Sequence, residues 1–386
     1  MFLGIPREVL GKEQRVAALP EQVRKYRDMG FEVLVEASAG KGALHGDVEY
    51  EEAGARLVPD PESLFAQADV ILKVKQPCLN EALGKHEVEM MRGGAILVTF
   101  LHPAAPPNHG MVKMLRDRNI TALTMDGIPR ISRAQRMDAL TSMSTVTGYK
   151  SVLIAANLFP KFIPMIGTAI GTVKSAKFLV VGVGVVGLQA IATAKRLGGA
   201  VKAVDINEAA RKSADSLGAK IAGFDVPAEL AMDEEGCAKA LPPEWLAKEQ
   251  EALRPLVEES DIVILSALVP GEVAPLLITE EMVAAMKPGS VIVDVAVDQG
   301  GNCAVTEPAS EITRHGVTVL GLWNIPGSMP VHASWLYANN MLHYVENLFK
   351  NGPDHPDFDD DIVKHSLVTL EGKIVHPGAL KAIGDN

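Results

Sequence analysis

Three glycines with a fixed spacing are the residues of this sequence with the clearest chemical use. Gly182, Gly184 and Gly187 form a GxGxxG pattern between an apolar run and a helix-length segment. In such a unit the first glycine permits a tight turn, the second lets a pyrophosphate approach the backbone, and the third lets helix and strand pack. Asp205 follows about 20 residues later, where its carboxylate can accept hydrogen bonds from ribose hydroxyls and repel a 2′-phosphate. The pattern predicts a site for NAD(H) rather than NADP(H); a glycine-rich turn without a ligand is the alternative.

Two later strand ends carry further candidates for the same site. Residues 266–271, SALVPG, and residues 294–301, DVAVDQGG, each follow an apolar run. Ligands bind open α/β sheets at the carboxyl ends of the strands, so both segments are expected at the site. Asp294 could contact a ligand there or could simply cap its strand. The residues predicted to contact the dinucleotide are Gly182, Gly184, Val185, Val186, Gly187, Asp205, Leu268 and Gly271.

The overall composition excludes several classes of protein. The 386 residues include 37 Lys plus Arg and 48 Asp plus Glu, a net charge of −11, whereas a nucleic-acid-binding protein needs a basic surface. Cys78, Cys237 and Cys303 are too far apart for a CxxC pair or a disulfide framework, and no cluster of His, Cys and carboxylates has metal-ligand spacing. Arg7 and Glu8 interrupt any apolar leader, so we expect a cytoplasmic protein.

The order of predicted elements indicates an α/β fold. Short runs rich in Val, Ile and Leu alternate with helix-length segments, as in parallel sheets covered by helices on both faces. We therefore expect two Rossmann-like, doubly wound parallel-sheet domains separated by a cleft. The first should comprise residues 1–137 and 333–386, and the second, which binds NAD(H), residues 138–332. The predicted strands are residues 31–36, 70–74, 95–100, 120–124, 178–182, 201–205, 262–266, 290–295 and 317–321.

Three segments stand outside this regular alternation. Residues 225–260 are acidic, contain a Pro-Pro step and are predicted to form a helical or loop excursion. Residues 336–348 have apolar side chains near helical spacing and predict a helix that leaves the second domain. The Pro- and Asp-rich residues 353–361 are expected to be a solvated linker or tail.

Several longer segments carry a recognisable pattern across nearly the whole chain. They are GIPREVLGKEQRVAALP at residues 4–20, PRISRAQRMDALTS at 129–142, FPKFIPMIGTAIGTVKSAK at 159–177, GVGVVGLQAIATAKRLG from 182, ITEEMVAAMKPGSVI, QGGN at 299–302 and KIVHPG at 373–378. Together they resemble the alanine dehydrogenase and pyridine nucleotide transhydrogenase family. Within that family the sequence is most similar to the soluble NAD(H)-binding first domain, or alpha subunit, of proton-translocating NAD(P) transhydrogenase.

This resemblance implies a site for the nicotinamide end of NAD(H). Arg130, Gln135 and Asp138 match the residues that surround it, and Thr141 stands where the relative has a serine. A cation, an amide and a carboxylate can hold a carboxamide and a ribose without any acid–base step. Without the resemblance, the same residues would indicate an ordinary charged turn and helix start. One departure is Cys237, which stands where the relative's mobile loop carries a tyrosine, and this puts one contact with the nucleotide in doubt.

Four other residues match the substrate site of alanine dehydrogenases. Arg15 could clamp a substrate carboxylate, Lys75 could polarise a keto oxygen, His102 could transfer a proton, and Asp298 could orient ammonia or water. Taken singly, each has a simpler explanation as a surface charge, a strand-end histidine or a loop cap. As a set, they indicate a site for a small 2-oxo acid.

The sequence thus supports two functions from different classes. The first is an NAD(H)-binding transhydrogenase alpha subunit, which passes hydride to NADP on a partner subunit and meets membrane subunits at the inner face of the membrane. The second is a soluble L-alanine dehydrogenase, which converts L-alanine and NAD to pyruvate, ammonia and NADH. A regulatory NAD-binding relative without turnover is a third. We favour the first because of residues 129–142, and the family implies a homodimer or larger assembly.

Overall fold

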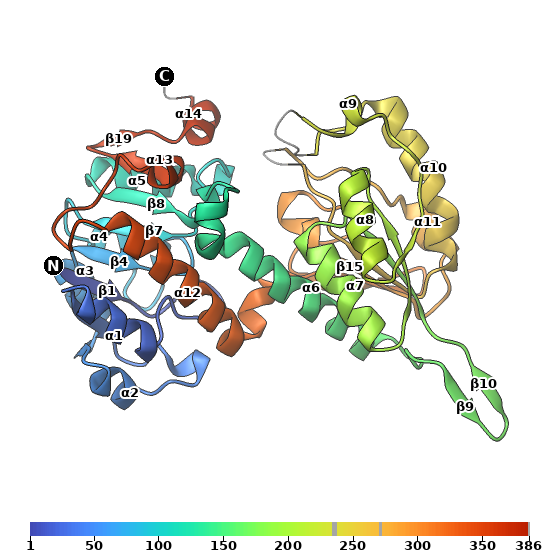
Figure 1. Ribbon diagram of the computed structural model, residues 1–386, viewed down its shortest axis with the longest axis horizontal. Helices are drawn as coiled ribbons and strands as arrows, with labels where there is room; N and C mark the ends of the chain where they lie inside the picture. Colours follow the sequence, from blue (N-terminus) through green and yellow to red (C-terminus); the bar gives the residue numbers. More distant parts are fainter. Residues whose placement is uncertain (234–237, 270–271, 385–386) are drawn as a thin grey trace. The chain divides into compact units, whose positions relative to one another are not determined.

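The computed structural model describes residues 1–233, 238–269 and 272–384, and the chain divides into two compact units. Unit 1 comprises Met1–Met143 and Pro326–Asn386, and unit 2 comprises Ser144–Ile325. Helix α6 (Ala139–Leu158) contains the first boundary. Each unit has one large sheet dominated by parallel strands, which confirms the predicted α/β class (Figure 1).

Unit 1 is built on an eight-stranded sheet with the order β19-β18-β8-β7-β4-β1-β2-β3. The neighbours from β8 to β3 are parallel, and β1 lies between β2 and β4, so the strand order reverses at β1. The C-terminal strands β18 and β19 run antiparallel and extend the sheet beyond β8. The bounds are β1 (Phe2–Ile5), β2 (Glu32–Glu36), β3 (Arg56–Val58), β4 (Val70–Leu72), β7 (Ile96–Thr99), β8 (Thr121–Thr124), β18 (Leu367–Leu370) and β19 (Lys373–Ile374).

The helices of unit 1 supply the apolar faces that cover this sheet. Helix α1 (Pro20–Asp28) begins with proline at its first position, as the sequence predicts. Helix α12 (Pro330–Leu348) starts six residues before the predicted helix and buries Tyr337 and Tyr344 completely. The others are α2 (Asp47–Glu52), α3 (Pro61–Gln67), α4 (Glu87–Met90), α5 (His109–Asp117), α13 (Asp361–Ser366) and α14 (Pro377–Ile383).

Unit 2 contains a seven-stranded sheet with the order β13-β12-β11-β14-β15-β17-β16. All neighbours are parallel except β16, which runs antiparallel to β17 at one edge. The strand order reverses at β11, so the carboxyl ends of β11 and β14 lie side by side, where doubly wound sheets bind ligands. The bounds are β11 (Lys177–Val181), β12 (Ala200–Val204), β13 (Lys220–Ile221), β14 (Ile262–Leu265), β15 (Val291–Asp294), β16 (Ser310–Arg314) and β17 (Val317–Gly321).

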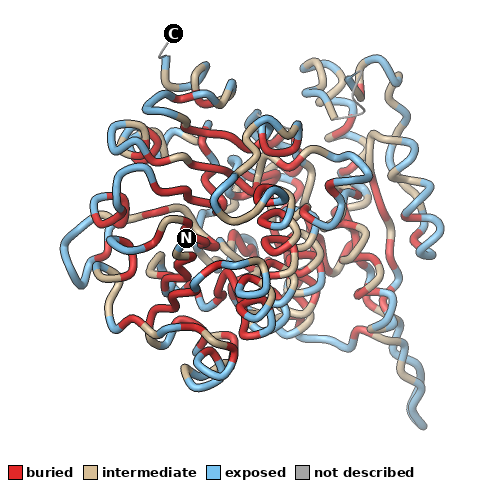
Figure 2. Tube along the Cα trace, turned by 60° about the vertical axis from the view of Figure 1, so that its left-hand side comes forward, coloured by how far each residue is buried: buried red, intermediate tan, exposed pale blue. Residues whose placement is uncertain are grey.

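Helices on both faces of the unit 2 sheet enclose two separate apolar cores. Most residues of the central strands are buried as a result (Figure 2). A two-stranded hairpin, β9 (Ile166–Thr168) and β10 (Gly171–Val173), projects from this unit as seen in Figure 1. The helices are α7 (Val185–Arg196), α8 (Glu208–Ser216), α9 (Ala228–Ala231), α10 (Pro243–Glu259) and α11 (Glu280–Ala285).

Two expectations about irregular segments need correction. The Pro-Pro step does not interrupt order, because Pro243 occupies the first position of the 17-residue helix α10, where a missing amide hydrogen costs nothing. The acidic segment 353–361 is not merely a solvated tail. Asp360 caps helix α13 and forms an ion pair with Arg133 at 2.7 Å, and these contacts anchor the segment to unit 1.

Candidate functional site

The turn between β11 and α7 requires glycine at two positions and leaves room at a third. Gly182 has φ of +84°, and a Cβ atom there would lie 2.5 Å from the amide nitrogen of Ala267. A Cβ atom at Gly187 would lie 2.1 Å from the carbonyl oxygen of Gly182. Beside Gly184, by contrast, no atom lies within 4 Å of an added Cβ. The turn therefore fits a dinucleotide, because the open position is the one that a pyrophosphate must approach.

Asp205, at the end of β12, holds this turn from behind. Its Oδ2 accepts a hydrogen bond of 2.6 Å from the Val183 amide, and its Oδ1 accepts one of 2.7 Å from the Asn207 amide. Burial raises the pKa of Asp205, and the two amide hydrogen bonds oppose that rise. Each carboxylate oxygen has a second lone pair, so Asp205 can still accept hydrogen bonds from ribose hydroxyls.

Glu249 is a second carboxyl group in this region, and it is absent from the residues predicted from the sequence. It lies in α10 with Leu253 and Val257, and these three side chains at helical spacing are buried. Burial, and to a lesser extent the charge of Asp205, raises the pKa of Glu249 to about 7. A glutamate within an apolar i, i+4, i+8 pattern was the signal that could have revealed it.

We expect Glu249 to make stability depend on pH. Its pKa rises from 4.5 in a model carboxyl group to about 7 in the fold, so the folded chain binds the extra proton between these values. Unfolding free energy should therefore fall as pH rises through this window, by about 3 kcal/mol in total. Glu249→Gln should remove that loss. Denaturant titrations of both proteins at several pH values measure it, and a stability difference independent of pH would contradict the assignment.

The two strand ends beside the glycine turn are tied together by buried polar side chains. Asp294 is fully buried and accepts hydrogen bonds from the amides of Ala296, Asn302 and Cys303 and from the hydroxyl of Thr306, at 2.8–3.1 Å. These bonds occupy Asp294 in organising its own loop, as the strand-cap alternative expects.

Asn302, within the QGGN segment, connects that loop to the neighbouring strand end. Its side chain accepts from the Ala267 amide at 3.0 Å and donates to the carbonyl oxygens of Ala267 and Pro275 at 2.9 and 2.8 Å. Leu268, the next residue, is 40% exposed. Gly271, the other predicted contact here, and Cys237 lie outside the described residues.

In unit 1, residues 129–142 form a short 3-10 helix (Ser132–Met137) followed by the start of α6. The structure brings Asp138 and Thr141 together, because Asp138 accepts hydrogen bonds from the Thr141 amide at 2.8 Å and hydroxyl at 2.6 Å. Arg130 and Gln135 are exposed. The segment thus presents these polar side chains from a backbone whose buried residues pack within unit 1.

Arg15 is buried and faces Glu13, a glutamate that was not predicted from the sequence. Its Nε and Nη2 donate to the two carboxylate oxygens of Glu13 at 2.8 and 2.6 Å, and its Nη1 lies 3.0 Å from the sulfur of Met143. Glu13 therefore occupies the guanidinium edge that would bind a substrate carboxylate bidentately. The alternation of charges in KEQR was the available signal.

Lys75 and His102 follow neighbouring strands at the carboxyl edge of the unit 1 sheet. Strand β4 precedes Lys75, β7 precedes His102, and these strands pair in parallel. The hydroxyl of Thr99 donates to the Lys75 carbonyl oxygen at 2.9 Å and joins the two strand ends. Asp298 is exposed in the loop after β15 and belongs to unit 2.

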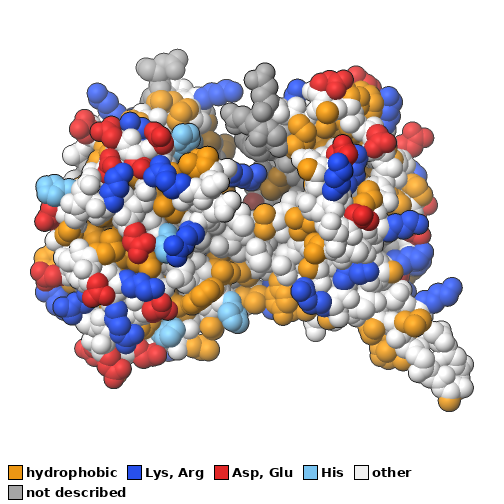
Figure 3. Space-filling model, viewed as in Figure 1, with side chains coloured by type: hydrophobic (Ala, Val, Ile, Leu, Met, Phe, Trp, Pro, Cys, Tyr) orange, Lys and Arg blue, Asp and Glu red, His pale blue; other side chains and the backbone are white. Residues whose placement is uncertain are grey.

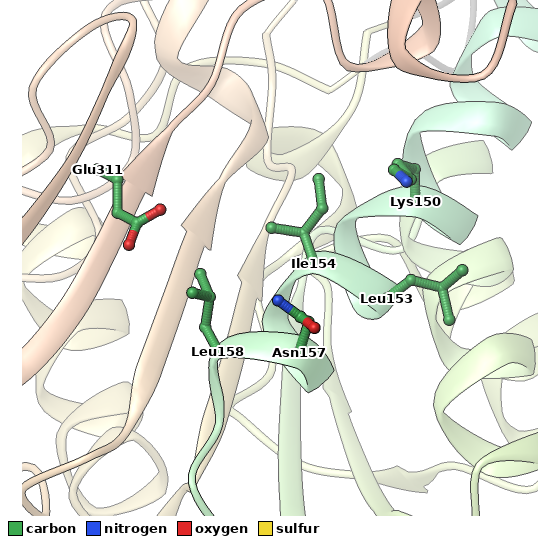
Figure 4. Close-up of a pocket in the computed structure, with 6 residues that line it drawn as sticks. All are labelled: Lys150, Leu153, Ile154, Asn157, Leu158 and Glu311. Carbon is green, nitrogen blue, oxygen red and sulfur yellow. The ribbon is translucent and has the colours of Figure 1, made fainter.

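A surface cavity of about 380 Å³ lies elsewhere, between α6 and β16 of unit 2. Three aliphatic side chains, Leu153, Ile154 and Leu158, line it together with Lys150, Asn157 and Glu311 (Figure 4). None of the predicted site residues lines this cavity.

Two features are absent from the described residues. No helix among them combines the length and apolar character needed to cross a bilayer. Nor do three or more His, Cys, Asp or Glu side chains gather there as the ligands of a metal ion would.

Nearly the whole chain matches known proteins. Residues 4–147 match the N-terminal domain and residues 151–377 the C-terminal domain of the alanine dehydrogenase/PNT family. The first part of NAD(P) transhydrogenase subunit alpha from Rhodospirillum rubrum, itself a separate chain, is 43% identical over 98% of both chains. An alanine dehydrogenase of Methanococcus maripaludis is 31% identical over 99% of this chain and 96% of its own. The crystal structure of transhydrogenase from Sinorhizobium meliloti superposes with a TM-score of 0.84 at 38% identity, covering 97% of this chain and all of the other.

These findings confirm the family that the sequence motifs resemble and the cofactor that the glycine pattern predicts. PNT stands for pyridine nucleotide transhydrogenase, and the family binds NAD(H). This chain belongs to the alanine dehydrogenase/PNT family of NAD-dependent oxidoreductases.

Proposed function

We propose that this chain is the NAD(H)-binding alpha subunit of an NAD(P) transhydrogenase, which transfers hydride between NADH and NADP held on a partner subunit. The observation that carries the proposal is the open position at Gly184 with Asp205 behind the turn, in a chain 43% identical over its length to such a subunit. When bound, NADH supplies the hydride. The membrane subunits of the complex would then hold this chain at the inner face of the membrane.

The chain's own residues act in this proposal by binding and orienting. The amides of Val185 and Val186, at the start of α7, face the pyrophosphate, and Asp205 accepts from the adenosine ribose. Leu268 and Gly271 complete the contact at the neighbouring strand end. No proton needs to move, because hydride transfer between two nicotinamide rings needs no acid or base.

The nicotinamide end is assigned to the segment that precedes α6. Arg130, Gln135 and Asp138 would fix the carboxamide and ribose, with Asp138 oriented by its two bonds from Thr141. Asp138→Asn should weaken NADH binding about tenfold, because a charged acceptor is lost. Fluorescence titration measures this, with the exposed Asp354→Asn as control; unchanged affinity in Asp138→Asn would remove the segment from the site.

Hydride transfer itself needs a partner. The purified chain mixed with NADH and NADP should show no transfer, and addition of an NADP-binding transhydrogenase subunit should start it. Absorbance of NADH and NADPH, separated by chromatography after quenching, follows the reaction. A chain that binds NADH but never transfers hydride to the loaded partner would overturn the proposal.

A second candidate function is that of an L-alanine dehydrogenase, and one arrangement favours it. Lys75 and His102 end adjacent strands of unit 1, and a carboxylate faces the histidine ring at 3.0 Å. In that reaction Asp298 would orient ammonia or water, and Arg15 could bind the substrate carboxylate only if Glu13 released it. NADH formation by the chain alone with L-alanine and NAD tests this function. Lys75→Ala should abolish the turnover.

We also propose a homo-oligomer, with a dimer as the smallest form. The hairpin of β9 and β10 and its approach carry four exposed apolar side chains, and isolated two-stranded hairpins are marginally stable in water (Figure 3). They are Phe162, Met165, Ile170 and Val173, with Ile170 fully exposed. Burial of these side chains on a second copy would remove them from water.

Ile170→Asp is therefore expected to weaken dimerisation about tenfold or more, because a charge would enter an apolar contact. Sedimentation velocity over a range of concentrations measures the effect. Leu44→Asp, at an exposed apolar residue of unit 1, is the matched control. Dissociation by the control and not by Ile170→Asp would refute the hairpin contact.

A further inference from the structure

His102 adopts a backbone conformation that two polar side chains impose. Its φ of +45° lies in the left-handed region, which is costly for a residue other than glycine. Oδ2 of Asp126 accepts hydrogen bonds from the amides of His102 at 2.7 Å and Leu101 at 3.2 Å. Nδ2 of Asn108 donates to the carbonyl oxygens of the same two residues, at 3.2 and 3.0 Å. Four hydrogen bonds therefore hold the strained turn, as expected where a side chain must be presented in one orientation.

The imidazole ring of His102 is also fixed. Its Nδ1 lies 3.0 Å from Oδ1 of Asp126, and the ring stacks on Phe100 with an interplanar angle of 4°. Phe100 in turn packs against the buried ring of Tyr337, with 5.3 Å between centroids. Because a carboxylate oxygen can only accept, the ring nitrogen that faces it carries the hydrogen. Nε2, on the edge away from Asp126, is left as the acceptor.

Asp126 is itself held in place, by donors that all face one of its oxygens. The hydroxyl of Thr124 donates to Oδ2 at 2.5 Å, in addition to the two amides of the turn. Oδ1 is thus the atom turned toward the His102 ring. The two oxygens of this carboxylate have separate tasks, and only one of them touches the imidazole.

The other groups near Asp126 leave this arrangement intact. His376, which caps α14, accepts the Ala379 amide through Nδ1 at 3.1 Å, and burial lowers the pKa of His376. It therefore stays neutral and does not compete with His102 for the charge of Asp126. Tyr337, from α12, donates its hydroxyl hydrogen to the Lys73 carbonyl oxygen at 2.8 Å, and its pKa is raised by burial.

We propose that Asp126 is a positioning residue that fixes His102 in the Nδ1–H form, so that Nε2 exchanges one proton with the carbonyl oxygen of a small 2-oxo acid. The proposal rests on the second candidate function above for its substrate class. In the reducing direction, Nε2–H of the protonated ring gives its proton to the oxygen as that carbon accepts hydride from NADH. The ring returns to the neutral Nδ1–H form, and Asp126 gains no proton.

The structure gives this proposal an unusual test in the Asp126→Asn variant. Three donors face the Oδ2 position, so the amide oxygen of the new side chain must take that place. Its NH₂ group then occupies the Oδ1 position and faces Nδ1 of His102 as a donor. The variant should therefore convert neutral His102 from the Nδ1–H to the Nε2–H form.

Long-range ¹⁵N–¹H NMR of histidine-labelled chain reads the two forms directly, and His102→Gln assigns the signal. We expect Nδ1–H in the unmodified chain and Nε2–H in Asp126→Asn. Glu346→Gln is the matched control, because it alters the ion pair of Glu346 with His343 at 2.8 Å in the same unit; it should leave the His102 signal unchanged. The Nε2–H form in the unmodified chain, or the same form in both proteins, would overturn the proposal, even if Asp126→Asn folded poorly.

Kinetics then separate this proposal from the function on which it rests. With pyruvate, ammonia and NADH, Asp126→Asn should lower kcat about 100-fold or more and leave KM nearly unchanged, because proton transfer and not binding is lost. An Nδ1–H form without turnover of any 2-oxo acid would refute the substrate class and retain the positioning role. Turnover unaffected by Asp126→Asn, in spite of a changed ring form, would refute the proton-transfer role.

Discussion

Replacement of Lys73 by Met is expected to lower the free energy of unfolding by about 3–5 kcal/mol, the usual cost of breaking a buried ion pair on one side. Lys73, at the end of β4, is buried, and its Nζ lies 2.8 Å from Glu87 and 3.2 Å from Glu8. The carboxylates also accept the amides of Val74 at 2.6 Å and Cys78 at 3.0 Å. Loss of the cation leaves two buried carboxylates without a counter-charge on either side of Lys75. Equilibrium denaturation in urea measures the change.

A control and a pH series sharpen this result. Lys85→Met removes an ion pair with Glu62 whose side chains are both about half exposed, so it should cost less than about 1 kcal/mol. Burial already raises the pKa of Glu8. A carboxyl group with a raised folded-state pKa contributes more stability as pH falls, so the Lys73→Met deficit should be smaller at about pH 5 than at about pH 8. Equal deficits at both pH values would mean that lost packing, not charge, is the cause.

Gly184→Val is expected to weaken NADH binding about 100-fold or more, equivalent to about 3 kcal/mol, and to leave the fold intact. The backbone there has φ of −75° and ψ of −161°, which any residue can adopt, and a new Cβ would meet no protein atom within 4 Å. The side chain would instead fill the space proposed for the pyrophosphate. Fluorescence titration with NADH gives the affinity, and thermal unfolding without NADH reports the fold.

The matched control is Gly46→Val in unit 1. Gly46 also precedes a helix in extended backbone, with φ of −84° and ψ of 161°, and an added Cβ there meets nothing within 4 Å. It should leave NADH affinity unchanged. If Gly184→Val bound NADH as tightly as this control, the dinucleotide would have to approach some other part of the turn.

Regular elements were predicted well because their signals are local. Each predicted strand is present with ends shifted by at most two residues, since an apolar run marks a buried strand wherever it pairs. The antiparallel strands β16, β18 and β19 were missed, because exposed or short edge strands lack that run and depend on a partner distant in sequence. The helix α10 was obscured by prolines that in fact mark its start.

The polar residues of the sites show the same limit more sharply. The glycine spacing and Asp205 predicted a turn whose geometry depends only on the nearest elements. Asp126 follows β8, and its importance appears only when β8 pairs with β7 and brings it beside His102. Glu13 is two residues from Arg15, but the burial that makes their pair matter is tertiary. Chain pattern therefore located motifs, and packing decided which charges face each other.

The divided course of unit 1 has a consequence for synthesis on the ribosome. Residues 326–386 supply α12 and the strand β18 that pairs with β8, and the Ser334 hydroxyl accepts the Val16 amide at 3.1 Å. The amino-terminal half of unit 1 must therefore wait, incomplete, while all of unit 2 emerges and can fold. A chain stopped at Ile325 should resist limited proteolysis in unit 2 and be cleaved in residues 1–143. The usual order, in which the first-made domain is the first to be finished, is reversed in this protein.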